Sequence, residues 1–175
     1  NVNWRSGRWS AFGDWTYASA TSDSPTRVPG LYESVEGKIA GHIPQAFAGY
    51  DLLTTEGSHL DVFGGLRYFD IKITLDLQGA ALPDADTDGD DQWLDAVAGA
   101  RWVTQFSGNW QSYLLADIGA GGSDLSWQAI ATIGYQYSWG SVVGGWRYLK
   151  TDYDSGSYRL DAALTGPFLG ASFAF

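Results

Sequence analysis

Hydrophobic and polar positions alternate with a period of two along most of the chain, the pattern of strands rather than helices. From Ser126 to Ser138, one face of such a strand carries Trp127, Ala129, Ala131, Ile133, Tyr135 and Tyr137. The opposite face carries Gln128, Ile130, Thr132, Gly134, Gln136 and Ser138. Residues 9–17 and 94–102 repeat this alternation. The pattern predicts an all-β protein whose strands have one mainly apolar and one mainly polar face.

Turn signals divide the chain into about eight such segments. We expect strands near residues 8–20, 32–54, 58–77, 92–106, 109–120, 124–138, 141–153 and 158–175. Tight polar turns at 55–58, 107–109 and 138–140 contrast with longer loops expected at 21–30 and 78–91. Short turns on one side and longer loops on the other are typical of outer-membrane barrels. We therefore predict one domain over residues 1–175, an eight-stranded antiparallel up-and-down transmembrane β-barrel with periplasmic N- and C-termini.

The second predicted strand changes phase in its middle. Its earlier apolar residues stand at odd positions, Val35, Ile39 and Ile43, and its later ones at even positions, Ala46, Ala48, Tyr50 and Leu52. Pro44 stands at the change. Because a bulge tolerates the missing N–H of proline, we expect a β-bulge there. Such a bulge would keep Glu36, Lys38 and His42 on the inner face of the barrel.

The composition agrees with a membrane barrel. The chain has 9 Trp, 10 Tyr, 8 Phe and 23 Gly, and Trp and Tyr at this density suit two membrane interfaces. A mean hydropathy of −0.17 is compatible, because only alternate residues of a barrel face lipid. The net charge of −10 argues against nucleic acid as a partner. The absence of Cys excludes disulfides and Cys nucleophiles, and the final Phe175 is expected of a last barrel strand.

One short motif occurs three times, as Gly65-Leu66-Arg67-Tyr68, Gly99-Ala100-Arg101-Trp102 and Gly145-Trp146-Arg147-Tyr148. In a strand, Gly and Arg share one face and the aromatic residue takes the other. An eight-stranded barrel is only wide enough inside for side chains, so inward Arg residues must pair with carboxylates. The predicted salt-bridge network of the lumen comprises Asp14, Glu36, Lys38, Asp51, Asp61, Arg67, Asp95, Arg101, Asp117 and Arg147. The alternative is a narrow ion or solute path gated by these pairs.

Five stretches of the chain carry a resemblance to a known group, namely DVFGGLRYFDIKITLDL, WLDAVAGARW, ADIGAGGSDLSWQAIATIGYQYS, GGWRYLKTDYD and TGPFLGASFAF. They resemble small outer-membrane β-barrel proteins of Gram-negative bacteria, in the superfamily of the OmpA transmembrane domain and OmpW. The resemblance covers residues 58–175 best. It implies an eight-stranded barrel in the outer membrane. It implies no reaction, because members serve as anchors, narrow channels, adhesins or occasional enzymes.

An acidic segment in the expected loop at 78–91 is a candidate cation site. Counted from Asp84, acidic residues stand at the first, third, fifth, seventh and twelfth positions, as Asp84, Asp86, Asp88, Asp90 and Asp95. Gly89 stands at the sixth, which is the spacing of a calcium loop with Asp in place of the usual final Glu. Asp95 also has an expected role in the lumen. The alternative is a solvated acidic loop without metal.

Catalysis is not expected, because neither His42 nor His59 is predicted to meet a serine and a carboxylate at the outer rim. We expect a structural, anchoring or interaction protein whose partners are outer-membrane lipid, lipopolysaccharide and another envelope protein. The alternatives are a narrow channel or small-solute-binding barrel, a rim enzyme, and a soluble lipocalin-like binder. The inward Arg residues argue against the lipocalin-like fold, which would carry an apolar ligand inside.

Overall fold

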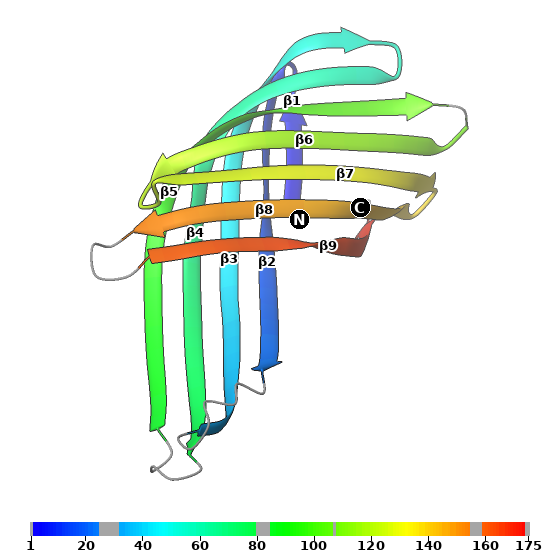
Figure 1. Ribbon diagram of the computed structural model, residues 1–175. Helices are drawn as coiled ribbons and strands as arrows, with labels where there is room; N and C mark the ends of the chain where they lie inside the picture. Colours follow the sequence, from blue (N-terminus) through cyan, green and yellow to red (C-terminus); the bar gives the residue numbers. More distant parts are fainter. Residues whose placement is uncertain (1, 25–31, 80–84, 107, 155–158, 174–175) are drawn as a thin grey trace. The chain divides into compact units, whose positions relative to one another are not determined.

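The computed structural model describes residues 2–24, 32–79, 85–106, 108–154 and 159–173. The strands are β1 (Val2–Ser6), β2 (Trp9–Ser24), β3 (Tyr32–Thr55), β4 (Ser58–Gly79), β5 (Ala85–Phe106), β6 (Trp110–Gly121), β7 (Leu125–Tyr137), β8 (Gly140–Asp154) and β9 (Arg159–Phe173). They form one up-and-down antiparallel sheet in chain order (Figure 1). The all-β, up-and-down prediction is confirmed. No helix among the described residues is long and apolar enough to cross a membrane.

The structure has one strand more than the eight predicted. The additional strand, β1, pairs with β2 from Val2 opposite Gly13 to Ser6 opposite Trp9. The two-residue turn between them begins with Gly7, whose φ of 59° lies in the left-handed region. A glycine at the first position of a two-residue loop is a strong hairpin signal. Within the described residues, β1 and β9 are the edge strands of the sheet.

The predicted β-bulge at Pro44 is wrong. Burial alternates without interruption from residue 42 to residue 51 of β3, with Ile43, Gln45, Phe47, Gly49 and Asp51 on the buried face. Pro44 and His42 are exposed at the intervening positions, so His42 is not on the inner face as predicted. The prediction failed because it assigned Ile43 to the same face as Ala46 and Ala48, whereas Ile43 is buried on the opposite face. The buried face itself carries apolar side chains at residues 43 and 47.

The prediction of a long loop at 78–91 is also wrong for residues 85–91. β4 continues to Gly79 and β5 begins at Ala85, so residues 85–91 are in a strand. The acidic residues 86, 88 and 90 alternate with other residues, and this period suits one polar face of an extended strand. Their acidic composition favours a loop, whereas the structure places residues 85–91 in β5.

The chain packs as two compact units. The first unit consists of residues 1–14, 45–67 and 94–175, and the second of residues 15–44 and 68–93. The first unit therefore holds β1, β6–β9 and part of each strand from β2 to β5. In the second unit, Phe69 and Trp93 stack with their ring centroids 4.8 Å apart, and both are buried.

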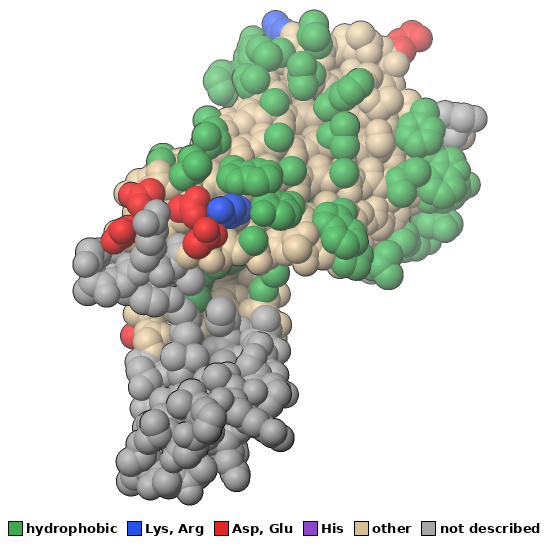
Figure 2. Space-filling view, in the orientation of Figure 1, with side chains coloured by type: hydrophobic (Ala, Val, Ile, Leu, Met, Phe, Trp, Pro, Cys, Tyr) green, Lys and Arg blue, Asp and Glu red, His purple; other side chains and the backbone are tan. Residues whose placement is uncertain are grey.

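The first unit has two unlike faces. Its inner face carries an apolar cluster of Phe47, Phe63, Val97 and Leu115, with Phe12, Tyr113 and Ile130 packed against it. Its outer face exposes large hydrophobic side chains, which Figure 2 shows spread over β6–β9. Counting β4 and β5 as well, the exposed hydrophobic residues of this face include Leu66, Trp102, Phe106, Trp110, Leu114, Ile118, Trp127, Ile133, Val142, Trp146 and Leu169. Strict alternation thus separates a packed inner face from an exposed apolar outer face.

The register from β5 to β9 runs residue by residue, without a bulge. Trp102 stands opposite Leu114, Leu114 opposite Ala131, and Ala131 opposite Trp146. Trp146 in turn stands opposite Pro167 on the edge strand β9, where a missing N–H is tolerated. The outer face is therefore continuous across five strands.

Gly65 provides a test of close packing on the inner face. A Cβ at Gly65 would collide with the carbonyl oxygen of Ala46 and lie 2.7 Å from Phe47 Cα. A Cβ at the neighbouring Gly64 would meet only Val97 O, at 3.6 Å. Gly65→Ala should therefore destabilise the fold by about 1–3 kcal/mol, measured by denaturant unfolding. Gly64→Ala is the matched control, and equal losses in the two variants would contradict the packing.

Candidate functional site

A network of buried charged and polar side chains lies on the inner face of the first unit. Of the residues predicted for the lumen, the buried ones are Asp51, Asp61, Arg67, Asp95, Arg101 and Asp117. Asp14 and Arg147 are partly exposed and also contribute. Glu36 and Lys38 are in β3, but their side chains lie outside the described residues. The strand period brings the six buried residues, Asp14 and Arg147 to one face.

Arg67 is the centre of the network and is fully buried. Its Nη2 donates to both carboxylate oxygens of Asp117 at 2.8 Å, and its Nε donates to Gln45 Oε1 at 2.8 Å. Gln128 Nε2 donates to Asp117 at 2.9 Å, and Gln128 Oε1 accepts from Arg147 Nε at 2.8 Å. Arg67 and Asp117 are therefore in direct contact, and the amide of Gln128 joins Asp117 to Arg147.

The network also links strands that are distant in the sheet order. Gln45 Nε2 donates to Asp14 at 2.7 Å, and Arg147 Nη1 lies 3.6 Å from Asp14 Oδ1. Asp14 is in β2 and Arg147 is in β8. Six strand positions separate them, so the sheet of the first unit must curl for their side chains to meet. The ion pair therefore shows that the sheet of the first unit is strongly curved around its inner face.

A second group of charges surrounds Arg101. Its Nε donates to Asp61 Oδ2 at 2.9 Å, and its Nη2 contacts the same oxygen and donates to Ser10 Oγ at 3.1 Å. The guanidinium also lies over the Phe12 ring, 3.9 Å from the centroid. The ring adds a cation–π contact to the ion pair. Arg101 therefore joins the polar network to the apolar cluster.

Arg5 extends this second group from β1. Its Nη1 donates to both oxygens of Asp51, at 2.9 and 3.1 Å, and its Nη2 lies 3.2 Å from Asp61 Oδ2. Sequence reasoning missed Arg5 because it missed β1. It also missed Ser10, Gln45 and Gln128 as network members. Their positions on the same strand faces as the inward charges were the available signal.

Asp95 has a different role from the one predicted. It accepts from Ser123 N at 2.9 Å, from Ser123 Oγ at 2.6 Å and from Ser126 Oγ at 2.7 Å. These hydrogen bonds satisfy a buried carboxylate with neutral donors and hold the connection between β6 and β7. In the described part of the chain, Asp95 thus fixes a turn rather than pairing with an inward Arg. Ser123 itself is also buried.

The predicted calcium residues are spread along a strand. Asp84 lies outside the described residues, and the side chains of Asp86 and Asp88 do as well, although their backbone is in β5. Asp90 is exposed, and both oxygens of Asp95 already accept hydrogen bonds. Among the described side chains, no three His or carboxylate groups are placed to share a metal ion. Calcium binding stays a prediction.

His42 is instead part of an aromatic group in the second unit. Its Nδ1 accepts from Trp15 Nε1 at 3.3 Å, and its ring lies 4.8 Å from that of Tyr17. All three side chains are exposed. This arrangement contains neither a nucleophile nor a carboxylate beside the imidazole in the described contacts.

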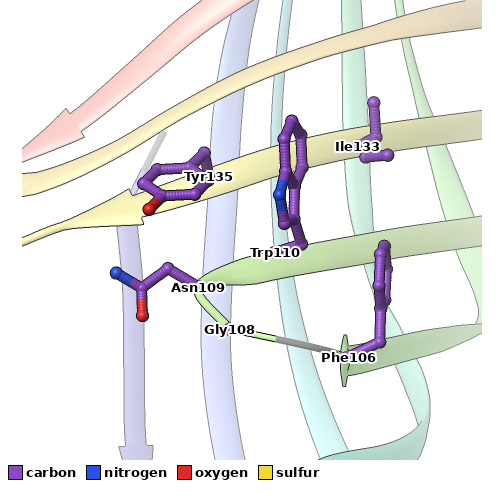
Figure 3. A pocket seen from close by; sticks show the side chains of 6 residues that line it. All are labelled: Phe106, Gly108, Asn109, Trp110, Ile133 and Tyr135. Atoms are coloured by element: carbon purple, nitrogen blue, oxygen red, sulfur yellow. The ribbon is translucent and has the colours of Figure 1, made fainter.

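A hollow lies on the outer face, where the turn between β5 and β6 meets β7 (Figure 3). Its volume is about 460 Å³, and its lining consists of Phe106, Gly108, Asn109, Trp110, Ile133 and Tyr135. Neither motif analysis nor charge patterning indicated it. The aromatic residues at the strand ends were expected only as part of an interfacial belt.

No protein-family model matches the chain, and no curated protein or solved structure shows significant similarity to it. The sheet and its network therefore define the class. It is an all-β protein with an up-and-down antiparallel sheet, ion pairs buried on one face and hydrophobic side chains exposed on the other.

The Arg67–Asp117 pair gives a direct test of the network. Arg67→Met should cost about 3–5 kcal/mol in unfolding free energy, because it leaves the Asp117 carboxylate buried without its cation. The double variant Arg67→Met/Asp117→Leu should recover much of that loss. Lys150→Met, which removes an exposed pair with Asp161, is the control and should change stability little. A double variant as unstable as Arg67→Met alone would show that the stranded charge is not the cause.

Proposed function

We propose that this protein is an integral outer-membrane β-barrel with a structural, anchoring or interaction role and a lumen filled by side chains. One observation carries the proposal. Trp102, Ile118 and Leu169 are 51, 57 and 87% exposed on the outer face, while Arg67 and Asp117 are buried on the inner face. A soluble domain places these two kinds of side chain the other way round. If the outer face lies against lipid, its exposed hydrophobic side chains are in an apolar environment, as in a membrane barrel.

The apolar outer face is broad as well as exposed. It is continuous over β5–β9, and contiguous patches beyond a few hundred Å² are rare on soluble monomers. β6, β7 and β8 have 12, 13 and 15 residues, and roughly 9–11 tilted residues cross a bilayer. The strands are therefore long enough for the proposed crossing.

Aromatic side chains gather near the ends of these strands. At one end, Trp110 packs edge-on against Tyr135, and Tyr137 stacks on Trp139. Towards the other end, Trp127 stacks on Tyr148 with ring centroids 4.6 Å apart. Two groups of Trp and Tyr, separated along the strands, suit the two interfaces of a membrane.

We further propose that β2–β9 close as an eight-stranded barrel, with β9 pairing to β2. The Asp14–Arg147 contact supports closure, because it brings β2 and β8 within ion-pair distance across the inner face. With eight strands, β9 and β2 run antiparallel, whereas β1 and β9 would run parallel. The five-residue β1 would then leave the edge of β2, and the contacts of Arg5 with Asp51 and Asp61 would be given up for the pairing of β9 with β2. The short turns, and with them both ends of the domain, are assigned to the periplasmic side.

The filled inner face favours an anchoring or interaction role over a channel. Arg67 and Arg101 are buried and held by several partners, and the Phe12–Phe47–Phe63 cluster fills the space beside them. The proposed partners are outer-membrane lipid, lipopolysaccharide and another envelope protein. No catalytic role is proposed. In this proposal the network maintains the barrel, and the wall and loops make the contacts.

The proposal predicts that the chain is monodisperse only in detergent or lipid. It also predicts an asymmetric effect of one added charge. Leu114→Arg, in the middle of the outer face, should lower folding stability in phospholipid vesicles by about 2–4 kcal/mol. Ser138→Arg, at the turn after β7, should cost about 0–1 kcal/mol. Both values can be measured by urea titration with intrinsic fluorescence.

A soluble protein would give the opposite result. It would stay monodisperse in plain buffer, and Leu114→Arg would be tolerated or would improve solubility. Either outcome would overturn the membrane proposal.

A further inference from the structure

The turn between β5 and β6 separates two hollows of different chemistry. The outer hollow of about 460 Å³ is the one lined mainly by rings and Ile133 (Figure 3). A smaller hollow of about 100 Å³ has a lining of Gln105, Gly108, Asn109, Trp110, Gln111 and Gln136. The two share Gly108, Asn109 and Trp110. One continuous strip of the rim thus passes from apolar rings to amide side chains.

The apolar hollow is built by the sheet register. Phe106 stands opposite Trp110, and Trp110 stands opposite Tyr135, so three rings fall in one row across neighbouring strands. Trp110 meets Tyr135 edge-on, with ring centroids 5.3 Å apart. Phe106 and Trp110 are each 43% exposed and Ile133 is 51% exposed. The volume falls within the range of roughly 300–1,000 Å³ that is typical of small-molecule sites.

The polar hollow contains amides and no ionic side chain in its lining. Gln105 and Gln111 stand opposite each other in the ladder, and the backbone N–H of Gln136 donates to Asn109 O at 2.8 Å. Each amide side chain both donates and accepts hydrogen bonds, as a hydroxyl group does. A phosphate or ammonium group placed here would find no counter-charge among the lining residues.

The space over the turn is open. Gly108 has a φ of 70°, and a Cβ built on it would meet no atom within 4 Å. A ligand can therefore lie over Gly108 and reach from the rings to the amides. The backbone bond between Gln136 and Asn109 holds the turn against β7, so the two hollows keep their spacing.

From these two hollows we infer a binding site for an uncharged amphiphile with a hydroxyl-rich head group, the chemistry of a neutral glycolipid. The alkyl chain lies against Phe106, Trp110 and Ile133, and the head-group hydroxyls meet Asn109 and the neighbouring Gln side chains. The site rests on the proposed membrane function, because the outer hollow must face lipid. It goes beyond that function by naming a lipid class that the rim selects.

Photo-crosslinking in phosphatidylcholine vesicles tests the site. Two probes carry the same diazirine acyl chain, one on a glucosyl diacylglycerol and one on phosphatidylcholine. The sugar probe should label residues 105–111 and 133–136 roughly fivefold more than the outer face around Trp146, the preference that one or two net hydrogen bonds supply. The phosphatidylcholine probe should show no such enrichment.

Three variants test the contributions of the two hollows separately. Trp110→Ala should abolish the enrichment, whereas Trp102→Ala, which removes a similarly exposed ring elsewhere on the outer face, should keep it. Asn109→Lys should reduce labelling by the sugar probe and increase labelling by an anionic phosphatidylglycerol probe. Folding of each variant is checked by its circular dichroism spectrum in the same vesicles.

Two negative results have distinct meanings. Equal labelling over the whole outer face by both probes would overturn the selective site and leave the membrane function intact. No labelling of the outer face by either probe would overturn both proposals. Retention of the enrichment in Trp110→Ala would also overturn the site.

Discussion

The ion pair between Arg67 and Asp117 sets the constraint on which the first unit depends. A buried guanidinium is tolerated only where a carboxylate and further acceptors surround it. Here Asp117 of β6 and Gln45 of β3 accept hydrogen bonds from Arg67, and Gln128 of β7 donates to the Asp117 carboxylate. The strands must therefore curl around Arg67. The Asp14–Arg147 contact across the same face follows from this curvature.

The curved inner face determines the character of the outer one. Once charges, amides and the Phe12–Phe47–Phe63 cluster fill the inside, the alternate positions must point outward. These positions carry Trp, Leu and Ile, so the sheet is apolar where it is exposed. Glycines such as Gly65 let the strands approach closely beside the large inward side chains. This distribution of side chains is the one that the proposed contact of the outer face with lipid requires.

Much of this arrangement could be predicted from period-two alternation, which gave the strands, their order and the inward Arg residues. The carboxylate with which each inward Arg pairs could not be predicted. A pair such as Arg101 and Asp61 depends on the curvature of the sheet rather than on sequence spacing. The phase of β3 was misassigned because Ile43 and Phe47 pack inward among polar neighbours. β1 was missed, and Arg5 with it. The acidic residues before Asp91 favour a loop by their composition, although their spacing of two residues is that of a strand.

The central proposal is that the outer face of this sheet meets lipid while its inner face is closed to both lipid and water. Because the chain has no Cys, single Cys residues from 129 to 133 in β7 can each carry a spin label in phospholipid vesicles. Labels at Ala129, Ala131 and Ile133 should collide freely with oxygen and hardly with a water-soluble nickel complex. Labels at Ile130 and Thr132 should be protected from both. Strong nickel collisions at residues 129, 131 and 133 would contradict the account.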